Sequence, residues 1–220
     1  MKLKLIGAVR LLTAVAILGS VYWQVSDRII NNVFHPEEYW AYFTIDTSLL
    51  MSAALLTGAA LAWFKNNHAP HWFEIGRLGV VGAYVVVAVV YNALLRNDPP
   101  DARDVAAGYS WPTPPNEILH VWAPLIVTLE VILVTPALRI KFVEVFWAAL
   151  YPVIWLTATI IRGNVDPQRW WPYWFINPDT GGVQSMLMYI VGITGILIVT
   201  TMVLLAIRKA IEALTRRMIS

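Results

Sequence analysis

The chain has 220 residues, of which 58% are hydrophobic and only 14% are charged. Soluble domains are about 45–50% apolar and about 25% charged, so this composition predicts an integral membrane protein. There is no cysteine, which excludes disulfides, thiolate nucleophiles and cysteine-ligated metals. The net charge of +2 is too small to indicate binding to nucleic acid.

Six apolar segments are spaced along the chain, each near the roughly 20 residues that a helix needs to cross the hydrocarbon core. The first segment contains Arg10 and is followed by no small-residue cleavage site, so we expect an uncleaved helix rather than a secretory signal. The sequence therefore predicts an all-α fold, a polytopic membrane protein whose residues 1–220 form one domain of six transmembrane helices. The expected helices cover residues 5–25, 42–64, 75–95, 118–138, 142–162 and 183–207.

Lysine and arginine are distributed unevenly between the two sides of this expected bundle. One side carries Arg28, Arg96, Arg103, Arg162 and Arg169. The side that holds both termini carries Lys2, Lys4, Arg10, Lys65, Arg77, Arg139, Lys141, Arg208, Lys209, Arg216 and Arg217. Because cytoplasmic loops are enriched in these residues, we expect both termini to lie in the cytoplasm. The second, fourth and sixth helices then begin at the outer face.

The expected fourth helix carries polar and ionisable groups that are costly at membrane depth. An ionisable group there costs about 3 kcal/mol on insertion scales, and it usually faces a bundle interior or a cavity. Asn116 and His120 lie one turn apart on the same helix face, with Glu117 next to them in the sequence. Glu130 lies about 15 Å deeper along the helix axis. These residues predict a polar face that enters the membrane from the outer side.

The expected second helix has a hydroxyl-bearing stripe at its outer end. Thr44, Thr47 and Ser48 follow helical spacing on one face, whereas Asp46 points about 200° away from Thr44 and needs another partner. The candidate partners at the outer end of the third helix are Asn92 and Arg96. The stripe fits a functional site, but it also fits hydrogen bonds to the preceding turn, which are common in membrane helices.

The expected fifth helix carries Tyr151, Trp155 and Arg162 on one face. Arg162 either binds a carboxylate or extends to the membrane surface. The long loop 96–117 is either a lid over a site or a tether between helices. The aromatic loop 163–182 is typical of anchoring at the membrane–water interface.

A metal site receives little support from the sequence. His68 and His71 lie on an expected cytoplasmic turn with no cysteine or obvious carboxylate partner, which is a weak metal signal. We therefore expect no metal and no cofactor.

Thr44 and His120 are expected at similar depth near the outer face. A hydroxyl group needs a base to become a nucleophile near neutral pH, and histidine has a suitable pKa. The two residues are therefore a candidate nucleophile and base, at the level where lipid esters keep their polar groups. From spacing alone, a satisfied polar core in a transporter or scaffold remains the alternative.

Three stretches of the chain carry distinctive motifs: Y-F-T-I-D at 42–46, N-E-I-L-H at 116–120, and YPVIWLTATIIRG followed by WWPYWFINP. They resemble the androgen-induced and androgen-dependent membrane hydrolase family, and more closely its bacterial six-helix relatives. The first is similar to the family's F-L-T-F-I-D and aligns Thr44 with the catalytic threonine. The second is similar to N-H-x-x-H and aligns His120 with the catalytic histidine, and Glu130 matches a carboxylate ten residues later.

The chain departs from the family pattern at three positions. Glu117 replaces the first histidine of N-H-x-x-H, Trp174 stands where proline is usual, and Pro124 comes one position early. The resemblance implies hydrolysis of fatty acid esters of hydroxy fatty acids by a threonine nucleophile. It also implies a location in the bacterial cytoplasmic membrane.

The residues and the resemblance together predict an intramembrane threonine hydrolase that cleaves long-chain fatty esters. Thr44 would attack the carbonyl carbon, with His120 as general base and then general acid. Glu130 would be protonated and would support the helix near His120. Donors to the oxyanion would be Thr47, Ser48 or Asn116. Arg162 would anchor a substrate carboxylate, and the remaining expected substrate contacts are Trp155, Tyr151 and Asn92.

The rival hypothesis is a non-enzymatic lipid-binding or proton-coupled transport protein that uses the same cavity. In a transporter, Asp46, Glu130 and His120 would form a proton relay. No inverted repeat is visible, which counts against transport. Under both hypotheses the partners are a lipid or fatty ester and the membrane lipids, with no nucleic acid. The sequence makes no prediction of the oligomeric state.

Overall fold

The computed structural model describes residues 2–98, 102–134 and 139–219. Every element within these ranges is helical, which confirms the predicted all-α fold. Six stretches of helix are long and apolar enough to cross a membrane, so the chain is an integral membrane protein with six candidate spans.

The first three crossings are single helices, and the later three are interrupted or extended. The first three are α1 (Lys2–Ile30), α3 (Phe43–Phe64) and α4 (His71–Val90), which continues into the π-helical turn η1 (Tyr91–Leu95). The fourth consists of α6 (Thr113–Glu117), the π-helical turn η2 (Ile118–Trp122) and α7 (Ala123–Leu133). The last two consist of η3 (Phe142–Glu144), α8 (Val145–Ala148) and α9 (Leu150–Val165), and of α10 (Pro178–Ile219). Short helices outside the crossings are α2 (Pro36–Tyr39), α5 (Ala102–Ala106) and η4 (Trp174–Ile176).

The first helix runs to Ile30 rather than to 25, the third begins at His71 rather than at 75, and the fourth and sixth crossings also differ from their expected ranges. The fourth begins at Thr113 rather than 118, because two prolines fit the first helical turn, where a missing N–H group costs nothing. Its helix ends at Leu133, and the expected end at 135–138 lies outside the described residues. The sixth begins at Pro178, and Gly182 interrupts its first turns with a φ of 79°, which only glycine adopts readily.

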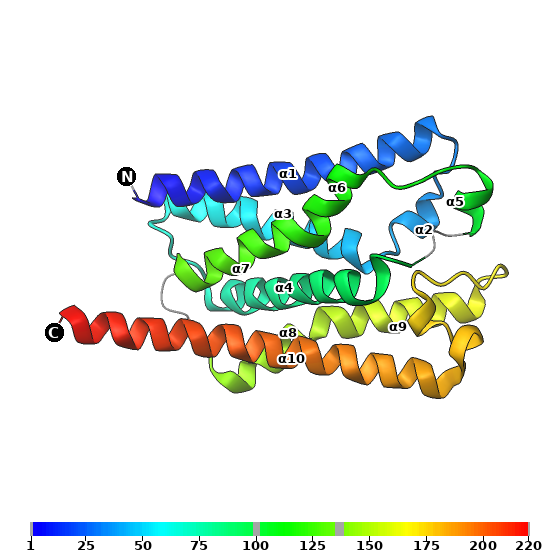
Figure 1. Cartoon of the computed structure of the whole chain (residues 1–220). Coiled ribbons are helices and arrows are strands. Elements are labelled where there is room, and N and C mark those ends of the chain that lie inside the picture. The colour runs from blue at the N-terminus through cyan, green and yellow to red at the C-terminus, as the bar shows by residue number, and fades with distance from the viewer. Residues whose placement is uncertain (1, 99–101, 135–138, 220) are drawn as a thin grey trace.

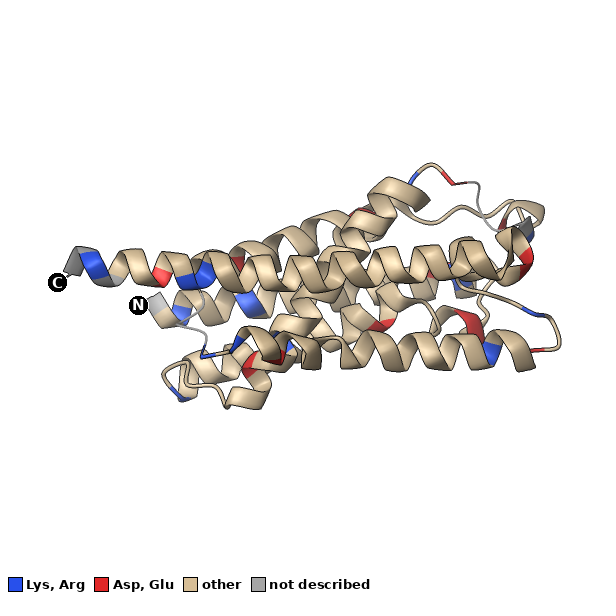
Figure 2. Cartoon of the chain, turned by 90° about the horizontal axis from the view of Figure 1, so that it is seen from below, with Lys and Arg blue, Asp and Glu red and all other residues tan. Residues whose placement is uncertain are grey.

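Helix α4 lies in the middle of the bundle (Figure 1). It packs against α3, α7 and α10, and α1 packs along α3. Both ends of the chain lie at the same end of the bundle (Figure 1), and lysine and arginine positions gather toward that end (Figure 2). The side of the membrane on which this end lies stays a prediction.

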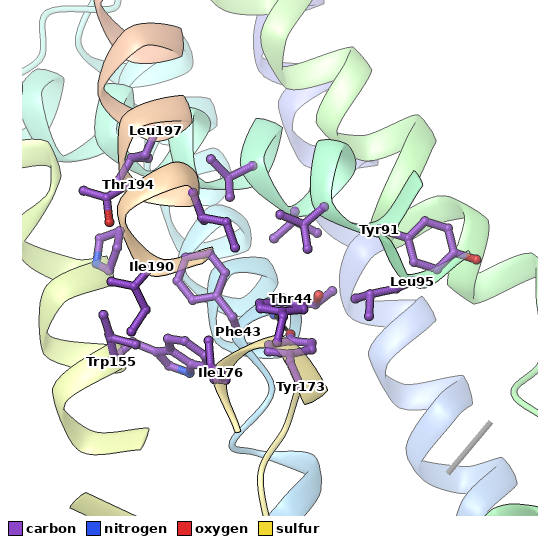
Figure 3. A pocket seen from close by; sticks show the side chains of 17 residues that line it. Phe43, Thr44, Tyr91, Leu95, Trp155, Tyr173, Ile176, Ile190, Thr194 and Leu197 are labelled. Atoms are coloured by element: carbon purple, nitrogen blue, oxygen red, sulfur yellow. Dashed lines mark hydrogen bonds between the residues drawn. The ribbon is translucent and has the colours of Figure 1, made fainter. Parts of the chain in front are cut away.

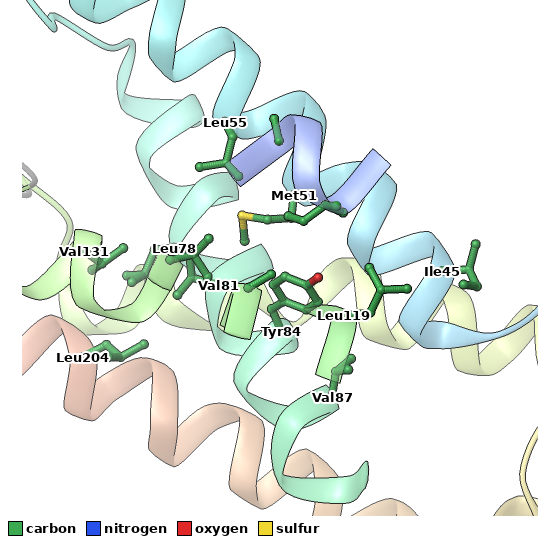
Figure 4. Close-up of a cluster of buried hydrophobic side chains, with 14 of the residues drawn as sticks. Ile45, Met51, Leu55, Leu78, Val81, Tyr84, Val87, Leu119, Val131 and Leu204 are labelled. Carbon is green, nitrogen blue, oxygen red and sulfur yellow. The ribbon is translucent and has the colours of Figure 1, made fainter. Parts of the chain in front are cut away.

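The main core joins α3, α4 and η2 (Figure 4). Met51 and Leu55 of α3 meet Tyr84 of α4 and Leu119 of η2, and all four side chains are at most 3% exposed. Lipid tails are as apolar as these side chains, so close packing rather than transfer from water holds membrane helices together. On the other face of α4, a Cβ atom at Gly82 would collide with Thr201, so this glycine lets α10 approach closely.

The long loop before the fourth crossing is tied to the bundle at the end opposite the termini. Arg28 of α1 binds Asp104 at 3.1 Å, and both side chains are less than 10% exposed. Arg103 binds Glu38 of α2 at 2.6 Å. This segment is therefore tied to α1 and α2 at that end of the bundle, and none of its described residues lines the pocket beside Thr44.

Candidate functional site

The candidate site lies where the start of α3 meets the two π-helical turns. In η2, the Ala123 N–H group bonds to the Ile118 carbonyl, five residues earlier. Pro124 explains this turn, because its ring lacks an N–H group and collides with the carbonyl four residues earlier, that of His120. The widened turn relieves that collision and positions the His120 side chain.

The turn η1 makes the matching half of this arrangement. Its closing bond runs from the Arg96 N–H group to the Tyr91 carbonyl, again five residues apart, at 2.7 Å. The rings of Tyr91 and His120 stack with their centroids 4.0 Å apart. The Asn116 side chain donates to the Tyr91 hydroxyl at 2.8 Å. The imidazole is therefore held flat against a tyrosine that is itself fixed by Asn116.

Thr44 and His120 are in direct contact. Thr44 Oγ1 lies 3.3 Å from His120 Nε2, and Thr44 is only 8% exposed. His120 Nδ1 lies 2.8 Å from the carbonyl oxygen of Asn116, which accepts hydrogen bonds and has no proton to donate. In the neutral imidazole the proton therefore lies on Nδ1, which leaves Nε2 as the acceptor for the Thr44 hydroxyl proton.

The hydroxyl stripe of α3 does not bond to the preceding turn. Thr47 Oγ1 lies 2.9 Å from the Tyr151 hydroxyl, and Ser48 donates to the Tyr84 hydroxyl at 3.3 Å. Other hydroxyl groups in the described helices do bond to the carbonyl four residues earlier, namely those of Thr13, Ser20, Ser52, Thr128, Thr157, Thr201 and Thr215. The stripe thus differs from ordinary membrane-helix hydroxyl groups, because its members bond to side chains on other helices.

Tyr173 is a site residue that the sequence reasoning missed. Its hydroxyl accepts the Thr44 backbone N–H at 3.5 Å, and it also interacts with the Phe43 backbone and the Thr44 side chain. The loop that carries it folds into the bundle, with Trp171 and Phe175 at most 8% exposed. From the sequence, the aromatic loop 163–182 is expected to anchor the chain at the membrane–water interface. The unmet N–H groups in the first turn of α3 were the signal that a partner was needed.

A pocket opens beside Thr44 (Figure 3). It contains about 720 Å³ of space, its open mouth included, and its walls come from α3, α4, η1, α9, α10 and the 173–176 segment. Most lining side chains are apolar, and the polar residues among them are Thr44, Thr194, Tyr91 and Tyr173, although the Tyr91 hydroxyl points away from the pocket toward Asn116 (Figure 3). An apolar pocket with a few polar groups at one place is typical of a small-molecule site.

Several residues expected at the site lie around it rather than in it. Trp155 lines the pocket, and its indole N–H donates to the Ala41 carbonyl at 3.1 Å. Asn92 accepts a hydrogen bond from Arg96 at 2.9 Å, and Arg96 also binds Glu117 at 2.9 Å.

Neither Asn92 nor Arg96, the two partners that we expected for Asp46, bonds to its carboxylate. Asp46 is half-buried, and its backbone N–H donates to the Tyr42 carbonyl at 3.2 Å, but no hydrogen bond or ion pair of its carboxylate is found within the described ranges.

Glu130 does not join the Thr44–His120 pair, and its expected protonated role near His120 is corrected by the structure. Its two oxygens bind Arg10 at 2.6 Å and Arg77 at 2.7 Å. Two guanidinium groups in this geometry stabilise the ionised carboxylate. The cluster joins α1, α4 and α7 in the interior, with all three side chains at most 8% exposed. The sequence reasoning missed it because both arginines were counted as surface charges.

The remaining candidates are an arginine and two histidines. The Arg162 guanidinium lies 4.6 Å from the centre of the Trp170 ring, and its Nη1 is buried without a hydrogen-bond partner among the described residues. His68 bonds to the Lys65 carbonyl, and His71 binds Glu144 at 2.9 Å. Over the same residues, no group of three or more histidine, cysteine, aspartate or glutamate side chains is placed to hold a metal ion.

Comparison of the chain with family models, with curated proteins and with solved structures finds no match. The chemistry of the site is therefore inferred from its own residues and their geometry.

Proposed function

We propose that this protein is an intramembrane hydrolase of long-chain fatty esters, with Thr44 as the nucleophile and His120 as the base. The observation that carries the proposal is the 3.3 Å contact between Thr44 Oγ1 and His120 Nε2, while the Asn116 carbonyl holds Nδ1 at 2.8 Å. A hydroxyl within reach of a base that a third group orients is the general arrangement for covalent catalysis.

The reaction proceeds in two steps. Thr44 Oγ attacks the ester carbonyl carbon while its proton moves to His120 Nε2, and the tetrahedral intermediate then expels the alkoxide, which takes that proton. Water attacks the acyl-threonine, gives a proton to Nε2 and releases the fatty acid as Thr44 recovers its hydroxyl. The net reaction consumes one ester and one water and yields one acid and one alcohol.

The substrate class follows from the pocket. A lining that is mostly aliphatic and aromatic, with Thr44 and Tyr173 together on one part of its wall, suits an acyl chain whose ester group lies at the threonine. Arg162 is the proposed anchor for a carboxylate at the other end of the substrate, because it keeps one buried N–H group without a partner among the described residues. We further propose the bacterial cytoplasmic membrane, with both termini in the cytoplasm and the site near the outer face.

The second candidate function is lipid binding without chemistry, which the apolar pocket also supports. A proton-coupled transporter has less support, because Glu130 binds two arginines instead of forming a relay with His120. Activity distinguishes the hydrolase from the lipid-binding protein.

The test uses purified protein in detergent, a fluorophosphonate probe and p-nitrophenyl decanoate. We expect the probe to label Thr44, as located by mass spectrometry, and the ester to be cleaved. Thr44→Ala should abolish both, and His120→Ala should lower the rate by about 10²–10⁴-fold, the usual contribution of a general base. The control is Thr157→Ala, which removes an exposed threonine hydroxyl that bonds only to the Val153 carbonyl. Unlabelled, inactive, well-folded wild-type protein would support the lipid-binding function instead.

A further inference from the structure

Within the described residues, the Thr44 side chain interacts with two polar side-chain groups. One is the His120 imidazole, and the other is the Tyr173 hydroxyl. Tyr173 lies in the 166–177 connection, between α9 and α10, and reaches the first turn of α3 (Figure 3). Its ring is fixed by stacking on Phe175, with the centroids 5.2 Å apart. The ring of Tyr42 lies 5.8 Å away on another side. A hydroxyl group on a ring held in this way has little freedom to move.

The direction of the hydrogen bonds around Thr44 can be assigned from chemistry. A backbone N–H group only donates, so the Tyr173 oxygen is the acceptor of its 3.5 Å bond with the Thr44 amide. The Thr44 hydroxyl proton is directed to His120 Nε2, which lacks a proton in the neutral tautomer set by Asn116. The Tyr173 hydroxyl proton is therefore left to donate toward the Thr44 oxygen.

Tyr173 also keeps its proton at neutral pH. Burial raises the pKa of its hydroxyl to about 12, since the charged phenolate is disfavoured away from water. The other hydroxyl and amide donors that we expected at the oxyanion bond elsewhere. Thr47 bonds to Tyr151, Ser48 to Tyr84 and Asn116 to Tyr91.

We propose that Tyr173 is a catalytic residue that stabilises the oxyanion of the proposed ester hydrolysis by donating a hydrogen bond to it. In the resting site its hydroxyl oxygen lies 3.5 Å from the Thr44 amide nitrogen, and Tyr173 and Thr44 line the same pocket. When Thr44 attacks, the carbonyl electron pair moves onto the ester oxygen, which is bonded to the same carbon as Thr44 Oγ and lies next to it. The Tyr173 proton is donated to that oxygen as a hydrogen bond and is not transferred, so no further proton acceptor is required. The amide that holds the Tyr173 oxygen polarises the hydroxyl and strengthens the donor.

This inference rests on the proposed hydrolase, and its test must separate the two. The decisive variant is Tyr173→Phe, which keeps the stacked ring and removes only the hydroxyl. Removing one oxyanion donor costs about 10²–10³-fold in kcat, and we expect a loss of that size with KM unchanged. A decyl trifluoromethyl ketone forms a tetrahedral adduct with the nucleophile, so its Ki should rise by the same factor as kcat/KM falls.

The matched control is Tyr189→Phe, which removes a hydroxyl from a ring that also packs against Phe175, tilted at 42° with the centroids 5.7 Å apart, and that is absent from the lining of the Thr44 pocket. It should leave kcat and Ki unchanged. Tyr173→Phe protein that keeps a kcat within about threefold of wild type, while Thr44→Ala is inactive, overturns the oxyanion role and leaves the hydrolase standing. A lower kcat with an unchanged ketone Ki also overturns it. Wild-type protein that neither cleaves p-nitrophenyl decanoate nor binds the ketone overturns the hydrolase, and this inference with it.

Discussion

The fourth crossing carries two buried polar clusters, and they differ in how their polar groups are satisfied. The ionic cluster of Glu130, Arg10 and Arg77 is enclosed, because all three side chains are at most 8% exposed. The Thr–His cluster of Thr44, His120 and Asn116 is uncharged, and one of its members lines a pocket. The two lie about 15 Å apart along one helix, from His120 to Glu130.

The comparison separates a structural role from a chemical one. Arg10 also donates to the Gly58 carbonyl and the Asn67 side chain, both at 2.7 Å, so the ionic cluster joins α3 and the following turn as well. A network whose donors and acceptors all face protein leaves no place for a substrate. In the Thr–His cluster, the Thr44 oxygen faces open space and a base at the same time, which is what a reaction requires.

The largest expected effect is the loss of stability in Glu130→Ala. Removing one partner of a buried ion pair leaves unpaired charge and costs about 3–5 kcal/mol, and here two guanidinium groups lose their carboxylate. Unfolding of purified protein in mixed detergent micelles measures the change. Glu37→Ala is the control, because Glu37 is 65% exposed, and it should stay within about 0.5 kcal/mol of wild type.

The same experiment tests whether the two clusters are independent. Folded Glu130→Ala protein should still react with the fluorophosphonate at Thr44, because the Glu130 carboxylate binds Arg10 and Arg77 about 15 Å along the helix from His120. Loss of labelling in protein that remains folded, or a destabilisation below about 1 kcal/mol, would contradict the division into a structural and a chemical cluster.

A smaller effect is expected from Leu197→Phe, which narrows the pocket. Leu197 lines the pocket from α10 and is 4% exposed, so a larger side chain fills space that an acyl chain would use (Figure 3). We expect kcat/KM for long-chain p-nitrophenyl esters to fall about 10-fold relative to short-chain ones, since a misfit in an apolar pocket costs about 1–3 kcal/mol. A chain-length series measures this shift.

The control for the pocket is Val199→Phe on the same helix, where the side chain is 61% exposed and faces away from the packed interior. It should leave the chain-length preference unchanged. An unaltered preference in Leu197→Phe would show that the acyl chain binds elsewhere, and the pocket would then have no part in the chemistry.

Much of the fold could be predicted because each crossing is marked by local composition. A run of about 20 apolar residues predicts a membrane helix without knowledge of its neighbours. Helical spacing likewise placed Asn116 and His120 on one face. Both inferences depend only on residues close together in the sequence. Hydropathy and periodicity are properties of such short stretches, so they are sufficient to make these two predictions.

The rest depended on contacts between distant segments, which those patterns do not report. Tyr173 reaches Thr44 across 129 positions, and its loop looked like an interfacial belt because tryptophan and tyrosine are common in both settings. Arg10 and Glu130 are separated by 120 positions, and the charge of Arg10 alone favoured a surface position. Pro124 is a local signal for an irregular helical turn at His120. Whether that turn becomes π-helical depends on how the neighbouring helices pack around it.

The smallest effect is expected from Glu117→Gln, at the position where the chain departs from the N-H-x-x-H pattern. The Glu117 carboxylate binds Arg96 at 2.9 Å, and it is the Asn116 carbonyl that orients the imidazole. Exposed ion pairs contribute little, so kcat should change by less than about threefold. His120→Gln under the same assay provides the contrast, because it removes the base itself. A loss in Glu117→Gln comparable to that in His120→Gln would mean that the carboxylate acts on the imidazole directly, and the Thr–His cluster would then include a charge and lose its contrast with the ionic cluster.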